Sequence, residues 1–342
     1  MSFSTPFASY ALLFLLLISC SSPSSNETIV NSDFAVKISP FAKVRDMEVS
    51  DDKIFLFTSK QELLVYSMVG KPILDTVLLQ PKLYPNGQVE AYLNNSLHSI
   101  FYFDHTIYSL GSNPSDLYSF KLQSQEISRQ HIKLGEGGLH DILSTSKDRI
   151  IVSFWNPRKN IVHFFAVDFP SLKPKKLIQI TPTAWQNTFA TFEFQDSLFL
   201  LETLKEGLRS ISDEKVSLIE EIFFLDSILY KEEIKGFKEI NEYTRLEPWQ
   251  RNQYNPDIII SVLQIGQDLA YFLVKKLNRS DPEAPEFELI LYKLSGKELE
   301  SRYLKGFQFA KLDPETQTFL GFTNESNAIV ISNLDSLVRS DR

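Results

Sequence analysis

The sequence of 342 residues contains a single cysteine, Cys20, and this scarcity excludes two classes of site. One thiol cannot form a disulfide within the chain, and it cannot supply the paired cysteines of a zinc or redox motif. Glycine is also scarce, with 12 residues, whereas 27 phenylalanines and 13 tyrosines favour large side chains packed in sheets. Beyond the start of the chain, no apolar run reaches the roughly 20 residues that span a membrane. The composition therefore predicts an all-β protein without disulfides.

A positive surface and the usual catalytic motifs are missing as well. The formal net charge is −8, which argues against general binding to a nucleic-acid backbone. The sequence has no G-x-S-x-G, no Walker A motif and no dinucleotide-binding fingerprint, and its five histidines show no metal-ligand spacing. We therefore assign no catalytic residue, metal or cofactor, and we favour a non-enzymatic role over an enzymatic one.

The apolar run from Tyr10 to Ile18 is too short to span a membrane but has the length of a signal-peptide core. It ends in Leu17-Ile18-Ser19-Cys20, which resembles the lipobox of bacterial lipoproteins. That resemblance implies cleavage before Cys20 and lipidation of its thiol, with a signal peptide at residues 1–19 and a lipidated, flexible tether at residues 20–33. Residues 1–19 contain no Lys or Arg, which departs from the usual basic start of a signal peptide. The alternative is an N-terminal strand or helix with an incidental cysteine.

A turn containing aspartate recurs along the rest of the chain between apolar segments. The recurring residues are Asp52, Asp104, Asp148, Asp196, Asp268 and Asp313, at separations of 52, 44, 48, 72 and 45 residues. A repeat of about 40–50 residues with several strands per unit is typical of a β-propeller, and four strands in each unit predict six blades. The longest separation indicates an insertion in one blade. The alternative fold is a pair of β-sandwiches, against which the near-constant spacing counts.

The last repeat lacks a fourth strand, because only the short segment 335–342 follows its third one. The strand-like segment Phe34–Ile38 has no other place in the repeat. We predict that it pairs with the last blade, closes the ring and protects an exposed sheet edge. Residues 34–342 would then form a single all-β domain.

The fourth strand of the first unit is expected over Ile73–Leu79. The long connections of this fold, Lys205–Ser217 among them, are expected on one face of the disc, because second-to-third loops and blade-to-blade links share a face in four-stranded blades. Such loops usually carry binding sites, and aromatic and arginine side chains are the types that anchor interfaces. The candidate ligand- or partner-binding residues are Trp155, Arg158, Trp185, Trp249, Arg251 and Tyr254. For Trp249 and Tyr254 the alternative is a structural role, in which they pin the insertion to the disc.

Two similar dipeptides, Arg45-Asp46 and His140-Asp141, open the inner strands of two blades. Both pairs could face the central channel, where a structural ion pair or turn is the favoured interpretation. The alternative is that Asp46, Asp141 and Glu193 converge on a metal at the axis.

The lipobox, the repeated aspartate hairpins and the glycine turns at Val69-Gly70-Lys71 and Ser295-Gly296-Lys297 resemble the TolB-like, six-bladed propeller lipoproteins of the Bacteroidetes. This resemblance implies an architecture and a cell-envelope location, and it carries no catalytic residues. Ser21 after Cys20 favours the outer membrane, with the periplasmic leaflet preferred and surface exposure left open. We hypothesise a membrane-anchored envelope lipoprotein that binds a protein or glycan partner, but no nucleic acid, without catalysis. The alternative is a propeller hydrolase or lyase with a metal on the central axis.

Overall fold

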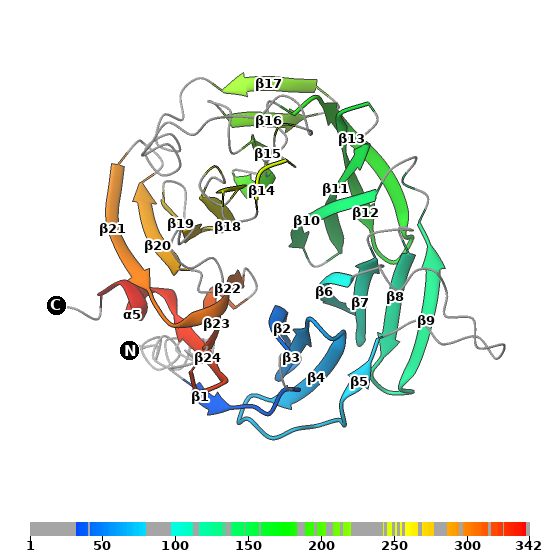
Figure 1. Ribbon diagram of the computed structural model, residues 1–342, viewed down its shortest axis with the longest axis vertical. Coiled ribbons are helices and arrows are strands. Elements are labelled where there is room, and N and C mark those ends of the chain that lie inside the picture. The colour runs from blue at the N-terminus through cyan, green and yellow to red at the C-terminus, as the bar shows by residue number, and fades with distance from the viewer. Residues whose placement is uncertain are drawn as a thin grey trace, which may run out of the picture.

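The computed structural model shows a ring of six four-stranded sheets in the part of the chain that it describes (Figure 1). The described residues are 32–39, 42–79, 97–111, 116–132, 134, 138–146, 148–156, 159–182, 189–194, 197–202, 208–212, 215–219, 242, 245–247, 250–251, 254, 257–265, 269–276, 286–293, 297–313, 316–323 and 325–339. Every pairing within these sheets is antiparallel, and five of the sheets follow chain order from the axis outwards. The prediction of an all-β, six-bladed propeller is confirmed.

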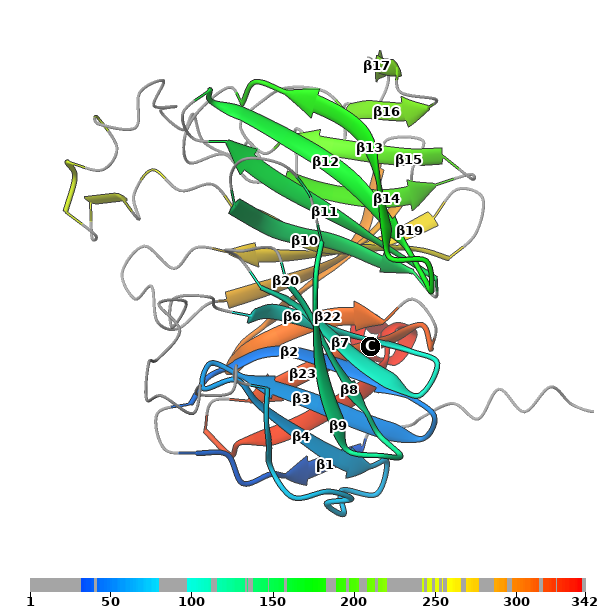
Figure 2. The same ribbon diagram turned by 90° about the vertical axis from the view of Figure 1, so that its right-hand side faces the viewer.

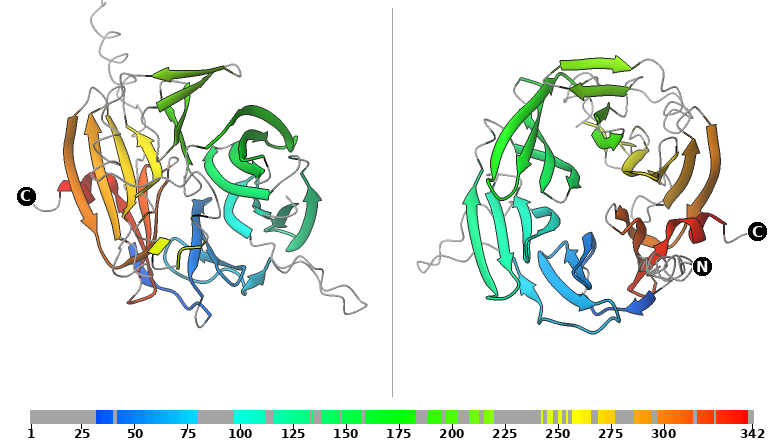
Figure 3. Two further views of the ribbon diagram at one scale, coloured as in Figure 1. Left: turned by 45° about the horizontal axis from the view of Figure 1, so that its top comes forward. Right: turned by 180° about the vertical axis from the view of Figure 1, so that it is seen from behind.

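Each blade begins with its inner strand, next to the axis (Figures 1 and 3). Blade 1 contains β2 (Val44–Ser50), β3 (Lys53–Thr58), β4 (Glu62–Ser67) and β5 (Val77–Leu78); blade 2 contains β6 (Leu97–Phe103), β7 (Thr106–Gly111), β8 (Asp116–Lys121) and β9 (Glu126–His131); blade 3 contains β10 (Gly138–Ser146), β11 (Arg149–Asn156), β12 (Ile161–Asp168) and β13 (Lys173–Ile180). Blade 4 contains β14 (Phe189–Phe194), β15 (Ser197–Glu202), β16 (Leu208–Ser212) and β17 (Lys215–Ile219); blade 5 contains β18 (Ile258–Gln264), β19 (Leu269–Lys276), β20 (Glu286–Lys293) and β21 (Lys297–Leu304); blade 6 contains β22 (Phe307–Asp313), β23 (Thr318–Thr323), β24 (Ala328–Asn333) and β1 (Ser32–Ala35).

Burial along the strands explains their apolar sequences. The second strand of a blade is covered on both faces by neighbouring blades, so Ile54 to Thr58 of β3 are all buried and read as a continuous apolar run. The outer strand β9 is mostly exposed and correspondingly polar. Apolar clusters fill the spaces between neighbouring blades; one of them, for example, joins Met47 and Leu56 of blade 1 to Phe322 and Ile329 of blade 6. The core is therefore distributed between the blades, whose strands Figure 2 shows with the disc edge-on.

The aspartate turns connect the inner strand of a blade to its second strand. Asp51 and Asp52 have φ values of 50° and 57°, and Asp104 and His105 have φ values of 45° and 57°. Two-residue hairpin turns of type I′ need positive φ at both positions, which Asp tolerates better than most residues. These two turns bear out the repeat from which the fold was predicted, whereas Asp196 and Asp268 lie outside the described residues.

The N-terminal strand closes the ring, as predicted. β1 pairs antiparallel with β24, with Ser32 opposite Ile331 and Ala35 opposite Ala328, and thereby becomes the outer strand of blade 6. The strand occupies Ser32–Ala35, two residues earlier than the expected start, and Val36 adds one further hydrogen bond to the carbonyl of Asn327 (2.9 Å). After β24 the chain forms a short helix, α5 (Leu334–Arg339), in place of a fourth strand.

Three expectations about the connections need correction. The outer strand of blade 1 was expected over Ile73–Leu79, but the ladder contains only Val77–Leu78 and an isolated bridge at Pro72, which has no N–H to donate. The segment Lys205–Ser217 was expected to be a loop, yet it contains β16 and the start of β17. Not every second-to-third loop is long, because only residues 59–61 separate β3 from β4. The large insertion lies between blades 4 and 5, at residues 220–257.

Candidate functional site

Five of the six inner strands carry a β-bulge near the end at which they begin. The register shifts lie after Val44 in β2, Leu97 in β6, Leu139 in β10, Ile259 in β18 and Phe307 in β22. A bulge inserts an extra residue, bends the strand and re-aims the side chains beside it. Arg45 and His140 occupy the bulge in their strands, and Asp46 and Asp141 resume the pairing. The two dipeptides singled out in the sequence therefore hold equivalent positions.

Asp46 links blade 1 to blade 2. Its carboxylate is buried, and Oδ1 accepts a hydrogen bond from the backbone N of Met47 (2.8 Å). Oδ2 accepts one from the backbone N of Ile100 in β6 (3.0 Å). The carboxylate thus satisfies an inner-strand N–H of the neighbouring blade, which would otherwise be a buried donor without an acceptor.

The same device recurs at two other blade boundaries. The hydroxyl of Ser261, directly after the bulge in β18, accepts a hydrogen bond from the backbone N of Leu312 in β22 (3.1 Å). The amide oxygen of Gln308, inside the bulge of β22, accepts one from the backbone N of Val44 in β2 (2.9 Å). Asp46, Ser261 and Gln308 are called the inter-blade acceptors below. Through these hydrogen bonds, a side chain of one inner strand binds the backbone of the inner strand in the next blade.

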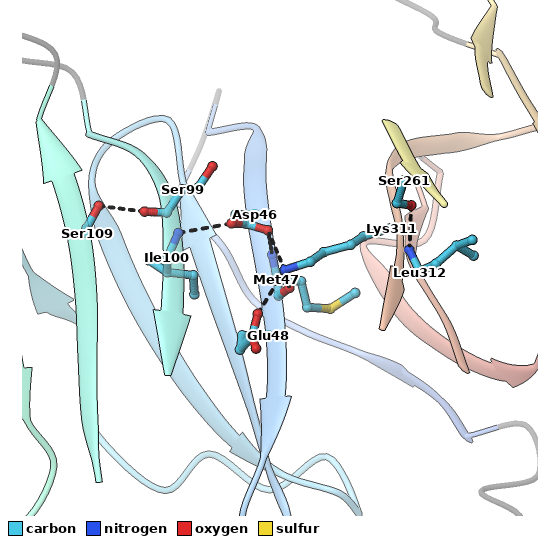
Figure 4. A network of polar contacts seen from close by, with 9 residues as sticks. All are labelled: Asp46, Met47, Glu48, Ser99, Ile100, Ser109, Ser261, Lys311 and Leu312. Atoms are coloured by element: carbon cyan, nitrogen blue, oxygen red, sulfur yellow. Dashed lines mark hydrogen bonds and ion pairs between the residues drawn. The ribbon is translucent and has the colours of Figure 1, made fainter. Parts of the chain in front are cut away.

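Lys311 of β22 crosses from blade 6 to blade 1 and ends among carboxylates (Figure 4). Its Nζ lies 2.8 Å from Glu48 Oε2 and 3.5 Å from Asp46 Oδ1, and it donates to the carbonyl of Met47 (3.3 Å). The Lys311 and Glu48 side chains are each 18% exposed. Together with the inter-blade acceptor Gln308, this ion pair joins the first and last blades of the ring beside the axis.

Both members of this ion pair have pKa values that differ from the ordinary ones, and the difference limits the chemistry they can perform. Burial raises the pKa of Glu48 to about 7, since the loss of solvation outweighs the attraction of Lys311. The pKa of Lys311 is raised, because the charges of Asp46 and Glu48 more than offset the effect of burial. Its ammonium therefore stays protonated and cannot act as a nucleophile or a general base, both of which need the neutral amine.

Asp46 and Glu48, the described carboxylates beside the axis, are paired with Lys311, and this pairing fits a structural role. Within the described residues, no group of three His, Cys, Asp or Glu side chains has the arrangement of a metal site. Asp46, one of the three acidic residues considered for an axial metal, is held by Lys311 and by two backbone N–H groups. The side chains of Asp141 and Glu193 lie outside the described part of the structure. The cluster acts chemically as a clamp between blades 6 and 1.

A second polar cluster ties blades 1 and 2 together at their aspartate turns. The hydroxyl of Tyr102 donates to Asp51 Oδ2, and the His105 Nδ1 lies 2.9 Å from the Tyr102 hydroxyl and 3.0 Å from Asp51 Oδ2. The hydrogen bond from Tyr102 lowers the pKa of Asp51, and burial followed by this bond raises the pKa of Tyr102. The Tyr102 ring also stacks on Phe55, with centroids 5.4 Å apart. The exposed ends of Asp51 and His105 leave this cluster accessible from the face of the disc.

The sequence-predicted binding residues are only partly described. Trp155 packs against the apolar cluster between blades 3 and 4 and is half-buried. Arg251 and Tyr254 lie in the insertion with helical backbone, and Arg251 Nε donates to the carbonyl of Leu246 (2.8 Å). Gln250 accepts a hydrogen bond from the backbone N of Glu247 (2.9 Å), as in a helix capping box. Cys20, Arg158, Trp185 and Trp249 lie outside the described residues.

The sequence interpretation missed Lys311 and Glu48. The available signal was a lysine between Ala310 and Leu312 in a predicted inner strand, where apolar residues dominate. A buried charge of this kind requires a partner, but the sequence alone does not show that the partner lies in β2, more than 260 residues away.

No protein-family model and no curated protein matches the sequence. Solved structures match the fold instead. A member of the DUF4221 family from Bacteroides vulgatus aligns with a TM-score of 0.54 at 11% identity, over 89% of this chain and 95% of that one. A Bacteroides fragilis protein, provisionally assigned as exported, aligns with a TM-score of 0.51 at 9% identity, over 88% of this chain and 93% of the other. At these identities the likeness establishes the propeller fold alone.

Proposed function

We propose that the protein is a lipid-anchored, TolB-like envelope propeller that binds a protein or glycan partner without catalysing a reaction. One observation carries the proposal: the charged side chains of the axial cluster, Lys311, Glu48 and Asp46, are engaged in holding blades 6 and 1 together, while the long connections gather on one face of the ring. A rigid ring with long loops on one end is the arrangement that binding scaffolds use. Fold likeness by itself would not support any activity.

The antiparallel order of the strands fixes which connections share a face. The second-to-third loops and the blade-to-blade links emerge on one side, which is called the long-loop face, and the remaining turns emerge on the short-turn face. The connections 79–96, 181–188, 220–257 and 277–285 belong to the long-loop face, and 79–96 and 220–257 are the two longest between described strands. Arg251 and Tyr254 belong to the third of these connections, and Trp155 lies in β11 one residue before a second-to-third loop. These residues support a binding role for that face.

A hydrolase or lyase with an axial metal has less support. Such an enzyme needs carboxylates or imidazoles that are free to coordinate a metal from several blades. Here Lys311 already neutralises Glu48 and Asp46, and Asp46 also accepts two backbone hydrogen bonds. Glu48 has a pKa in the range of a general acid or base, but burial, which outweighs the attraction of Lys311, accounts for that pKa without a catalytic role.

The envelope location is supported by the sequence around Cys20. The apolar run followed by Leu17-Ile18-Ser19-Cys20 favours lipidation, and Ser21 favours the outer membrane over the inner one. The Bacteroides fragilis propeller with the same fold is provisionally assigned as exported. In the described part of the chain, no helix is long and apolar enough to cross a membrane. We propose, from the residues around Cys20, that the lipid holds the protein at the outer membrane, on the periplasmic leaflet.

Site-specific photo-crosslinking in cells tests the binding face. A photoreactive amino acid at Lys159, between β11 and β12 on the long-loop face, is compared with one at Lys121, at the end of β8 on the short-turn face. Both lysines are exposed. We expect a discrete crosslinked product from position 159 and none from position 121, and we expect Trp249→Ala with Arg251→Ala to abolish it without lowering the melting temperature. A product from both positions, or from neither, contradicts the proposal.

Lipidation has its own test. Metabolic labelling with an alkyne fatty acid should label the wild-type protein and leave Cys20→Ser unlabelled and released from the membrane fraction. An unlabelled wild-type protein would remove the membrane anchor from the proposal and leave the propeller unaffected.

A further inference from the structure

Exposed large apolar side chains are concentrated along the outer edge of blade 1. The exposed large apolar side chains of the described residues are Val69 (74% exposed), Tyr303 (53%), Leu78 (51%) and Ile73 (44%). Three of these four lie within ten residues, in the turn and outer segment that follow β4. A depression of about 510 Å³ lies beside them, between residues 72–77 and Phe120 and Gln125 of blade 2. Val69 and Ile73, in and next to the turn after β4, are therefore candidates for a contact surface, whereas Leu78 pairs with Glu62 at the other end of β4.

The turn that carries Val69 lies on the short-turn face, because it connects the third strand of blade 1 to the outer segment. Ile73 lies three residues after Gly70 of this turn and beside β4, because its backbone N donates to the carbonyl of Val65 (2.8 Å). The aspartate turn of the same blade is adjacent, because the backbone N of Met68 donates to the carbonyl of Asp52 (3.3 Å). Val69 and Ile73 thus project where two turns of blade 1 meet.

The N-terminal segment reaches the disc from the same side. β24 is the third strand of blade 6 and, like β4, runs towards the short-turn face; β1 is antiparallel to it and starts opposite Ile331, near that end. β1 also touches the Val69 turn, since a methyl group added to Gly70 would lie 2.6 Å from the ring of Phe34. The closing strand and the apolar turn are therefore neighbours across the boundary of blades 6 and 1.

The distance from the lipid to this rim is short. Eleven residues, 21–31, lie between Cys20 and Ser32. Such a segment spans at most about 40 Å when extended, and its root-mean-square length as a flexible chain is about 20 Å. A lipid on Cys20 would hold the short-turn rim of blades 6 and 1 within a few nanometres of the bilayer.

We propose that Val69 and Ile73 dock on the lipid surface to which Cys20 is anchored, so that the long-loop face points away from the membrane. The inference rests on the lipidation assigned under the proposed function. Two partly inserted aliphatic side chains bind a bilayer weakly by themselves, but tethering makes the contact intramolecular and therefore populated. The long-loop face is then presented to partners instead of being buried against the membrane.

The charges beside the apolar turn indicate what kind of lipid surface it fits. Asp51 and Asp52 lie in the adjacent turn, Asp75 follows in the outer segment, and Lys53 and Lys71 lie beside them, so this edge has no excess of positive charge. A strongly anionic surface would gain no net attraction from such an edge. We therefore expect docking on zwitterionic phospholipids, driven by the apolar side chains, with the lysine stems lying along the interface.

Depth-dependent fluorescence quenching tests the orientation. The full-length lipidated protein is reconstituted into phosphatidylethanolamine–phosphatidylcholine vesicles that contain a brominated lipid, with a thiol-reactive fluorophore at Val69→Cys or Tyr303→Cys. Tyr303 is the matched control, because it is an exposed apolar residue at the opposite end of a blade, near the end of β21. We expect a loss of fluorescence at position 69 and an unchanged signal at position 303.

Two results separate this inference from the proposed function. A mass measurement that shows acylated Cys20, combined with no quenching at position 69 or with stronger quenching at position 303, overturns the docking and leaves the lipoprotein assignment standing. An unacylated Cys20 overturns both. Ile73→Asp in the labelled protein should reduce the quenching at position 69, whereas an unchanged signal in that variant also counts against docking.

Discussion

At the scale of single residues, the most informative side chain is Lys311. Its ammonium lies beside Glu48 and Asp46, and all three side chains are less than a fifth exposed. Removing such charges from water costs several kcal/mol, and their mutual attraction offsets this cost only when Lys311, Glu48 and Asp46 are all present. The cluster therefore specifies which strand faces which at the boundary between blades 6 and 1, more than it adds to stability.

Replacing Lys311 with Met should expose this dependence. Glu48 and Asp46 would be left buried without their cation, and we expect the free energy of unfolding to fall by about 3–5 kcal/mol. Chemical denaturation measures the change. Lys305→Met is the control, because Lys305 is exposed between β21 and β22 and its replacement should change stability by less than about 0.5 kcal/mol. Equal effects of the two substitutions would show that the ion pair has no structural role.

The pH dependence of stability should report on Glu48. Its pKa of about 7 in the folded protein lies above the ordinary value of 4.5, so the folded state keeps a proton that the unfolded chain releases. This contribution to stability is fully present below pH 4.5 and is lost as the pH rises through about 7. Its size is on the order of 3 kcal/mol, because the pKa rises from 4.5 to about 7 and each pKa unit corresponds to about 1.4 kcal/mol.

Glu48→Gln provides the comparison for that profile. Glutamine does not titrate, so the decline in unfolding free energy between pH 4.5 and 7 should be smaller in this variant than in the wild type. Denaturation series across this pH range measure both profiles. Identical slopes would mean that Glu48 titrates at the same pH in the folded and unfolded states.

At the scale of single elements, the closing strand depends on one glycine. Gly70 has a φ of +78° and a Cβ at this position would meet the Phe34 ring at 2.6 Å, whereas Gly306 has a φ of +80° and open space around it. Gly306→Ala should therefore cost only the roughly 1–2 kcal/mol of left-handed backbone strain. Gly70→Ala should cost about 1–3 kcal/mol more, from the clash with Phe34.

A double substitution separates these two causes. In a Phe34→Ala background the ring is gone, so the additional cost of Gly70→Ala should shrink towards the cost of Gly306→Ala. Thermal and chemical unfolding of the four variants give the coupling energy. Additive effects would place the Gly70 turn out of contact with β1.

The elements and their order were largely predictable, whereas the axial cluster was not. Positive φ at Asp52 and Asp104 follows from local turn chemistry, so the repeat was visible in the sequence. The unpaired strand at the N-terminus followed from counting strands. The outer strand of blade 1 was overestimated, because Pro72 and the residues after it interrupt the ladder. Lys311 and Glu48 belong to opposite ends of the chain, and only the closed ring brings them together.

At the scale of the whole molecule, closure makes the two ends of the chain interdependent. β1 supplies the outer strand of blade 6, and Lys311 and Gln308 of that blade bind β2 at its inner edge. The same boundary is thus held at the rim by backbone pairing and at the axis by buried charge. The apolar cluster between these two points includes residues of β2, β3, β23 and β24. Opening the boundary at one point should weaken the others.

Removal of β1 tests this interdependence. A variant that begins at residue 38 lacks the strand and leaves the outer edge of β24 without its partner, whereas a variant that begins at residue 32 keeps it. An unpaired edge strand recruits other chains, so we expect the shorter variant to melt at a lower temperature and to form dimers or larger species on size-exclusion chromatography with light scattering. A synthetic peptide of residues 30–39, added in trans, should restore the monomer and part of the melting temperature. If the shorter variant is monomeric and has the melting temperature of the longer one, β1 is not needed to close the ring. The ion pair of Lys311 and the contacts of the inner strands would then be enough to hold blades 6 and 1 together.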